Sequence, residues 1–259
     1  MSGNGFEQTT YEKWQKWLDI IYEEIQALSI YRGVYREVQK LIKANPKIQK
    51  PSSFYDFLDI AYTAFAAMSI RRQMKINSDS ISFARLLSGM KEHPEIMSRD
   101  RFVALYKATS DKACGVEALQ KHLENRPLKT FRKYSDSSES QFNPEIADHD
   151  LQGLKYTAEK VEIFTDKRIA HNDKSMQKTL ATFKDLDNSV DFLENLLKKY
   201  WLLFHAETLL NYPGTYQYDW KQIFRYPWIE HKEGSIVDNR AIKSDLLSEE
   251  VEVVAESRK

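Results

Sequence analysis

The chain has 259 residues, of which 42% are hydrophobic and 29% are charged, a composition typical of a soluble globular protein with a buried core. Its 38 basic and 38 acidic side chains cancel formally, so any contact with nucleic acid must use a local patch. The single cysteine, Cys114, excludes an intrachain disulfide. We find no signal-peptide pattern and no apolar run of membrane-spanning length, and therefore expect a cytoplasmic protein with no membrane partner.

Only 8 glycines and 7 prolines occur in the chain, which favours long helices over a turn-rich β fold. Residues 1–9 are predicted to be a flexible tail, followed by a helix that Thr9 or Thr10 caps near Tyr11 and that ends at Asn45. Apolar residues repeat along this helix at steps of three, four or seven, which predicts one buried stripe: Trp14, Leu18, Ile21, Ile25, Leu28, Tyr35, Val38 and Ile42.

A second helix is predicted to open at Pro51, Ser52 and Ser53. Its stripe comprises Phe54, Leu58, Ala61, Phe65 and Met68. Four residues further on, the same stripe reaches Arg72. Either the Arg72 stem lies on the core while its head reaches solvent, or the charge points inward to a carboxylate or a site.

Shorter helices are expected over 81–90, 99–105 and 114–123. The segment 126–143 is basic, contains Phe131 and Tyr134, and continues into a serine-rich loop. It is interpreted as a solvated connector or as an arm that contacts phosphates through Arg132 and Lys133 and stacks a base on an aromatic ring.

Pro144 opens a helix whose apolar face continues to Thr165 and Ile169, and the last strong helix, over 190–205, is expected to begin at Asp185 to Asn188. The predicted fold class is therefore all-α, with one helical domain over 10–212. An aromatic-rich extension over 213–242 is expected to pack on this domain, and residues 243–259 are expected to form a mobile tail.

Charged and polar side chains cluster at the end of the helix that Pro144 opens. Asp166, Arg168, His171, Asn172 and Lys174 fall within nine residues. If the helix stays regular, His171 lies roughly 120° from the centre of the buried stripe. His171 is then a surface residue, or it faces a cleft or a partner subunit.

Residues 166–174, with Ile169, Ala170 and His171 at their centre, resemble the signature end of the HEPN superfamily in its abortive-infection U-type branch. A second resemblance lies upstream, and together the two cover about residues 10–205: Met68, Ser69, Ile70, Arg71 and Arg72, then Asp79, Ser80, Ile81 and Ser82, with Leu86 and Leu87. The resemblance implies a helical bundle. Together with the helical patterns above, the expected fold is a HEPN-like antiparallel bundle with long helices and a small irregular C-terminal extension. It also implies a homodimer that cleaves RNA without a metal or other cofactor, in a toxin or phage-defence system.

The HEPN motif is an arginine, four to six residues, then a histidine, often with a polar residue after the arginine. His171 matches the histidine and Asp166 the polar position, while Thr165 stands at the position of the arginine. Cleavage through the 2′-hydroxyl needs a proton-transfer group, for which histidine is suited, and a cation for the phosphate charge. Arg72, Arg71 or Arg168 is expected to supply that cation, with Arg71, Asn172, Lys174, Arg132 and Lys133 as candidate substrate-binding residues.

Three other interpretations stay open. The chain is an inactive HEPN-like module that binds RNA or protein, or a structural partner of a cognate protein with no affinity for RNA. His149 and Asp150 also suggest a metal-dependent phosphohydrolase of the HD type, which needs a second histidine such as His122 and a further aspartate.

Overall fold

The computed structural model describes residues 3–113, 126–136, 138–166, 181–210, 212–213 and 218–228. It divides the chain into two compact units, Met1–Gly214 and Thr215–Lys259. The described residues form α-helices, short 3₁₀ turns and two isolated β-bridges, with no β-strand among them. This confirms the predicted all-α fold. The second unit contains one described element, the 3₁₀ turn η4 (Trp220–Arg225).

Helix α1 (Gly3–Ala44) is the longest described element, about 63 Å from end to end. It begins at Gly3, whereas the sequence predicted a helix start near Tyr11 after a flexible tail. That prediction is wrong for the part of the tail that the structure describes. The physical reason lies at Thr9, whose hydroxyl donates to the Gly5 carbonyl inside the helix (2.9 Å) instead of capping its start. The turn η1 (Pro46–Ile48) follows the helix, at the predicted Asn45–Pro46 break.

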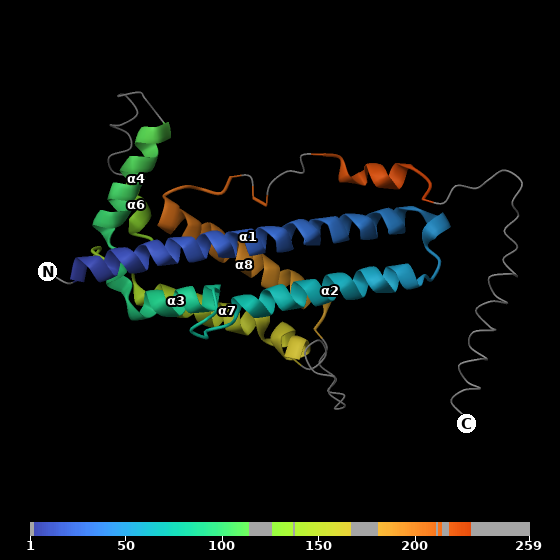
Figure 1. Cartoon of the computed structure of the whole chain (residues 1–259), viewed down its shortest axis with the longest axis horizontal. Coiled ribbons are helices and arrows are strands. Elements are labelled where there is room, and N and C mark those ends of the chain that lie inside the picture. The colour runs from blue at the N-terminus through green and yellow to red at the C-terminus, as the bar shows by residue number, and fades with distance from the viewer. Residues whose placement is uncertain are drawn as a thin grey trace, which may run out of the picture. The chain divides into compact units, whose positions relative to one another are not determined.

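Helix α2 (Ser53–Gln73) returns beside α1, capped by the Ser52 side chain as predicted. The two helices are antiparallel, because Tyr35 stacks on Tyr62 while Gln73 reaches back to Glu24 (Figure 1). The predicted stripe of α2 is not the face that the core buries. Its buried residues lie one or two positions along: Tyr62, Ala66, Ala67 and Ile70.

Helix α8 (Phe183–His205) packs against the length of α1 in the opposite direction. Thr182 and Asp185 form a capping box at its start, so the helix begins at Phe183, just upstream of the predicted start at Asp185 to Asn188. Tyr11, near the start of α1, donates to the Phe204 carbonyl at the end of α8 (3.0 Å). The pairing fixes the register of the two helices.

Helix α7 (Pro144–Phe164) begins at Asn143, whose side chain accepts from the Glu145 amide. It is antiparallel to α8, because Asp150 meets Lys199 at one end and Lys160 meets Asp185 at the other. Helix α3 (Phe83–Glu92) packs on α7, and the turn η2 (Pro94–Ile96) follows it. Fully buried side chains of these helices and α1 form a continuous core that includes Leu18, Ile21, Phe83, Leu154, Leu197 and Tyr200.

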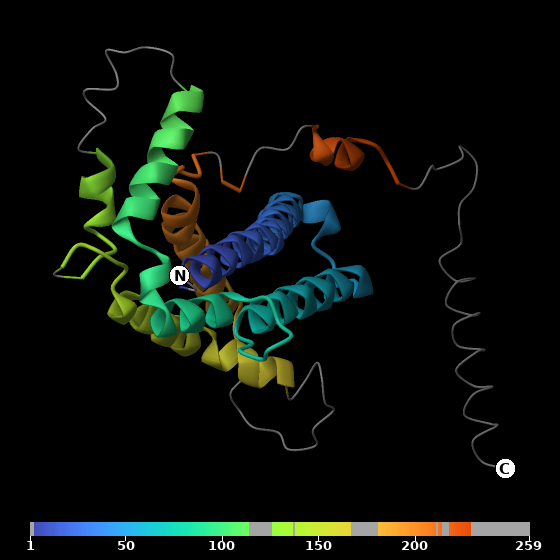
Figure 2. The ribbon, with the colours of Figure 1, turned by 60° about the vertical axis from the view of Figure 1, so that its left-hand side comes forward.

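Helices α4 (Arg99–Ala113) and α6 (Arg126–Phe131) lie beside the N-terminal end of α1 (Figures 1 and 2). The predicted helix over 114–123, with Cys114 and His122, lies outside the described residues. No helix in the described ranges is long and apolar enough to cross a membrane.

Candidate functional site

The last turn of α2 carries Arg71 and Arg72, which point to different neighbours because consecutive helical residues differ by about 100°. Arg71 forms an ion pair with Asp166, which follows α7. Arg72 lies 3.6 Å from a carboxylate oxygen of Glu24 on α1 and donates to the Ser69 hydroxyl (3.3 Å). The C-terminal ends of α2 and α7 therefore meet at Arg71, and Arg72 faces α1.

Thr165 and Asp166 adopt a wider π-helical turn at the end of α7. Thr165 is fully buried, as its place on the apolar face predicted, and its hydroxyl donates to the Val161 carbonyl (2.7 Å). Its neighbour Asp166 points to the surface, where its side chain is 46% exposed. An arginine side chain is too large and too polar for the space that Thr165 fills.

Arg71 keeps hydrogen-bonding capacity beyond its ion pair with Asp166. Its side chain is 23% exposed, and its Nε is buried without a hydrogen bond to any residue that the structure describes. A guanidinium has five N–H donors in a planar fork, which matches the oxygens of a phosphate. Arg71 is thus a partly exposed cation whose Nε has no hydrogen-bond partner among the described residues.

Gln73 and Glu24 fix the end of α2 to its neighbours. The Gln73 amide donates to Glu24 (2.7 Å), and its oxygen accepts from the Phe83 backbone at the start of α3 (3.1 Å). Gln73 is buried, and it holds the same carboxylate that faces Arg72. Arg72 and Glu24 are therefore part of the contact between α1, α2 and α3.

The other predicted residues of this cluster, Arg168, His171, Asn172 and Lys174, lie outside the described residues. Of the predicted set, the structure brings together Arg71, Arg72 and Asp166. His171 follows Asp166 by five positions in the sequence.

Arg132 and Lys133 are at the other end of α7. Both are exposed, and Arg132 pairs with Glu139 (2.9 Å). The Tyr134 carbonyl beside them accepts from Asn143, the cap of α7, whereas Asp166 follows the opposite end of that helix about 30 Å away. These two bases do not share a site with Arg71.

The aromatic side chains of segment 126–143 are not available for stacking on a base. Phe131 is 1% exposed and Tyr134 is 5% exposed, and the Tyr134 hydroxyl donates to the Lys199 carbonyl (3.1 Å). The predictions of a base-stacking arm and of a fully solvated connector are both wrong, because this segment contains α6 and contributes to the core.

His149 and Asp150 do not form a metal site with their described neighbours. The His149 ring is 90% exposed, while Asp150 accepts from Lys199 (2.6 Å) and from the Tyr200 hydroxyl (2.7 Å). Among the described residues, no three or more histidine, cysteine, aspartate or glutamate side chains are arranged to hold a metal ion.

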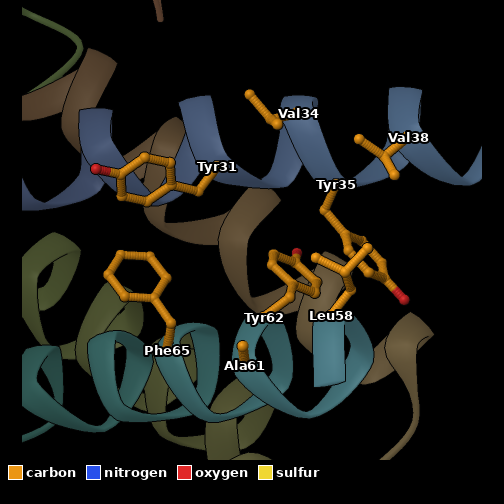
Figure 3. Close-up of a pocket in the computed structure, with 8 residues that line it drawn as sticks. All are labelled: Tyr31, Val34, Tyr35, Val38, Leu58, Ala61, Tyr62 and Phe65. Carbon is orange, nitrogen blue, oxygen red and sulfur yellow. The ribbon is translucent and has the colours of Figure 1, made fainter. Parts of the chain in front are cut away.

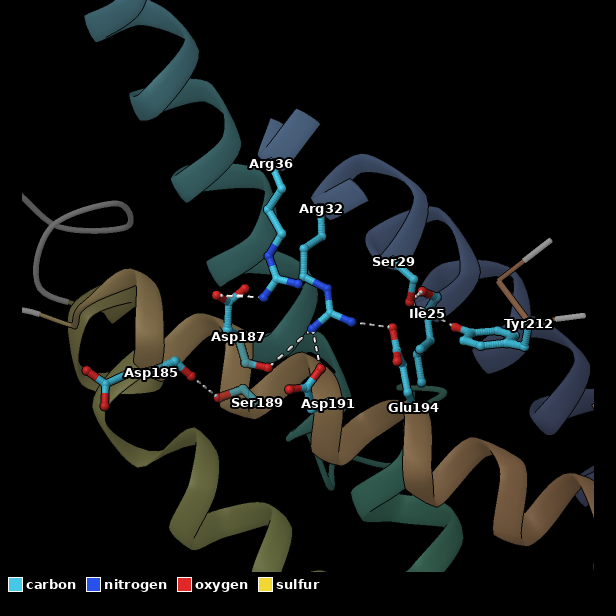
Figure 4. Close-up of polar contacts among 10 residues, drawn as sticks. All are labelled: Ile25, Ser29, Arg32, Arg36, Asp185, Asp187, Ser189, Asp191, Glu194 and Tyr212. Atoms are coloured by element: carbon cyan, nitrogen blue, oxygen red, sulfur yellow. Dashed lines mark hydrogen bonds and ion pairs between the residues drawn. The ribbon is translucent and has the colours of Figure 1, made fainter. Parts of the chain in front are cut away.

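Sequence reasoning missed a buried arginine on α1. Arg32 bonds Asp191 (2.5 Å) and Glu194 (2.6 Å) on α8, and one turn later Arg36 pairs with Asp187 (2.7 Å) (Figure 4). Arg32 stands four residues after Leu28 on the apolar stripe, which is the same signal that singled out Arg72. The Arg32 side chain is 9% exposed, so its guanidinium joins two helices and is itself hardly accessible to a ligand.

Comparison with models of protein families, with curated proteins and with solved structures finds no match to this chain.

Proposed function

We propose that the chain is a HEPN-like, metal-independent endoribonuclease whose site includes the C-terminal ends of α2 and α7. The ion pair between Arg71 and Asp166 carries this proposal. It places a cation suited to phosphate beside the carboxylate that stands five positions before His171 in the sequence. We therefore assign the role of the cation to Arg71 and not to Arg72, which faces Glu24.

In the proposed reaction, the 2′-hydroxyl of RNA attacks the adjacent phosphorus and the bond to the 5′-oxygen breaks, which leaves a cyclic phosphate. His171 transfers a proton to or from these oxygens. Arg71 stabilises the negative charge that develops on the phosphate, and Asp166 orients the guanidinium. Arg168, Asn172 and Lys174 are proposed to contact the RNA on either side.

Incubation of the intact protein with mixed RNA in EDTA tests cleavage directly. We expect the wild type to degrade the RNA and His171→Ala to leave it intact, because the variant lacks the proton-transfer group. Intact RNA in both reactions would refute a metal-independent nuclease.

A second candidate function is a non-cleaving HEPN-like module that binds RNA or protein. It is favoured by the buried Thr165 at the position of the motif arginine, and by the carboxylate that neutralises Arg71. Such a module would bind RNA without degrading it, and its affinity would fall as salt increases because phosphate contacts release counterions. A purely structural partner of a cognate protein would show no RNA affinity even at low salt.

The biological setting is part of the same proposal. A toxin or phage-defence protein of the cytoplasm, active as a homodimer, would bring two copies of the His171 segment together across a two-fold axis. Light scattering at micromolar concentration measures this directly, and a monomer would exclude a composite site.

A further inference from the structure

Helices α1 and α2 carry a second apolar face at the edge of the core. Tyr31, Val34 and Val38 of α1 lie opposite Leu58, Ala61 and Phe65 of α2, around a hollow of about 300 Å³ (Figure 3). On both helices these residues follow the spacing i, i+3 or i+4, and i+7. This spacing lets one helical stripe contact another helix along its length.

The floor of this groove is closed by aromatic rings. Tyr35 stacks on Tyr62 with 4.1 Å between ring centroids, and Phe183 at the start of α8 stacks on Tyr35 at 5.6 Å. On the opposite side, Tyr31 is 53% exposed and Ala61 is also exposed. Within the described part of the chain, α8 covers one side of this helix pair and the groove side stays open.

Two further apolar side chains of α2, which do not line the hollow, are exposed to solvent. Phe57 is 63% exposed and Ile60 is 68% exposed. Contiguous exposed apolar surface of this kind marks interaction sites more often than single exposed side chains do. The predicted stripe of α2 is therefore half-buried or exposed, and it is not part of the fully buried core.

The end of the groove is positively charged. Lys43, Lys47 and Lys50 are exposed around the connection between α1 and α2, and none forms an ion pair with a described residue. Two nearby carboxylates are already engaged, since Asp59 accepts from Tyr35 (2.7 Å) and Glu37 pairs with Lys40 (2.6 Å). Asp56, in the first turn of α2, offsets only part of the charge.

We propose that this groove binds an acidic amphipathic helix of a partner protein. The apolar stripe of the partner helix fills the hollow between Val34 and Ala61, and its carboxylates face the three lysines. A second copy of the chain would bring the same lysines to the interface, so charge complementarity favours an acidic partner over self-association. The proposal is independent of RNA cleavage.

A displayed library of helical peptides about 14 residues long, with apolar residues fixed at i, i+3, i+4 and i+7 and random residues elsewhere, tests this surface on the intact protein. We expect the selected peptides to be net acidic. Ala61→Glu places a charged side chain in the groove at an exposed helical position, and should weaken their binding at least about tenfold. Tyr156→Glu on α7, at a residue that is 83% exposed, is the matched control and should leave binding unchanged.

A triple variant tests the contribution of the groove lysines: Lys43→Glu, Lys47→Glu and Lys50→Glu. Its control carries three matched substitutions elsewhere on the bundle: Lys16→Glu, Lys107→Glu and Lys155→Glu. The groove variant alone should lose affinity for acidic peptides, by about tenfold or more at low salt. Selection of basic or neutral peptides, or equal binding to wild type and Ala61→Glu, would overturn the proposal. So would a dimer in light scattering that Ala61→Glu dissociates when no peptide is selected, because the occupant would then be a second copy.

Discussion

Asp150 is a buried carboxylate that links α7 to α8 through two partners of different kinds. The side chain of Lys199 is 33% exposed, whereas Tyr200 is fully buried and its hydroxyl has no access to water. Burial and the nearby Asp150 charge raise the pKa of Tyr200 well above its ordinary value, so the phenol stays protonated and donates to the carboxylate.

Replacement of Asp150 by alanine should lower the free energy of unfolding by about 2–4 kcal/mol, because Tyr200 would be left with a buried, unpaired hydroxyl. Urea denaturation followed by circular dichroism measures this loss. Asp148→Ala removes an exposed carboxylate on the same helix, bound to Lys91, and should cost less. Equal losses in the two variants would show that burial of Asp150 does not matter.

His205, at the end of α8, makes the stability of the protein depend on pH. Its ring stacks on Trp201 and lies 3.3 Å from Asp19, yet burial lowers its pKa below the ordinary 6.5, against the attraction of Asp19 and Glu207. The unfolded chain therefore binds a proton at a higher pH than the folded protein does. Stability that His205 contributes near neutral pH is lost as the pH falls through 6.5 toward the lower folded value.

We expect His205→Gln to lose less stability than the wild type between about pH 7 and about pH 5, because the variant has no imidazole to protonate on unfolding. Urea midpoints at the two pH values give the comparison. His149→Gln, at a ring that is 90% exposed, is the control for the loss of a histidine from the surface. An unchanged pH dependence in His205→Gln would contradict the assignment.

At the scale of elements, α1 and α8 are joined by apolar packing and by the arginine cluster at their centre. Arg32→Ala should destabilise the protein by about 3 kcal/mol, near the lower end for a broken buried pair, because Asp191 is 59% exposed and can be hydrated. Arg36→Ala removes a 48% exposed arginine one turn away and should cost less than about 1 kcal/mol. Thermal unfolding compares the two, and similar losses would count against a special role for Arg32.

Most helices could be predicted from the sequence because their signals are local. Pro51 with Ser52 marks the start of α2 through a cap that the structure contains, and Pro144 marks the start of α7. The face of α2 that enters the core could not be predicted, since both of its faces are apolar and the choice depends on where α8 packs. Phe65 and Leu58 satisfied the periodicity, but Ala66 and Ile70 are the residues that the core buries.

The candidate site was predicted in part, because the sequence singled out both Asp166 and the arginine pair. Arg72 was placed first among the cations since it continues the apolar stripe, but the ion pair with Asp166 belongs to Arg71. Which of the two neighbouring arginines pairs with Asp166 depends on the angle at which α7 crosses the end of α2. The local sequence pattern of neither helix predicts this crossing angle. Arg132 and Lys133 were grouped with the site because their segment is basic and contains aromatic residues, but α7 separates them from Arg71.

At the scale of the whole molecule, long antiparallel helices hold two surfaces of different character on one bundle. Arg71 and Asp166 lie where α2 and α7 end, and the apolar groove lies toward the connection between α1 and α2. In the proposed function the first surface acts on RNA, and in the further inference the second binds a partner helix. Variants of one surface should leave the function of the other unchanged.

The central claim is that Arg71 supplies the cation for RNA cleavage. The most direct measurement is the rate of cleavage of a defined RNA in EDTA by the wild type, Arg71→Ala and Arg72→Ala. We expect Arg71→Ala to lose at least about a hundredfold in rate, because a preorganised charge is removed from the phosphate, and Arg72→Ala to stay within a few-fold of the wild type. Full activity in Arg71→Ala, or an equal loss in Arg72→Ala, would contradict the claim.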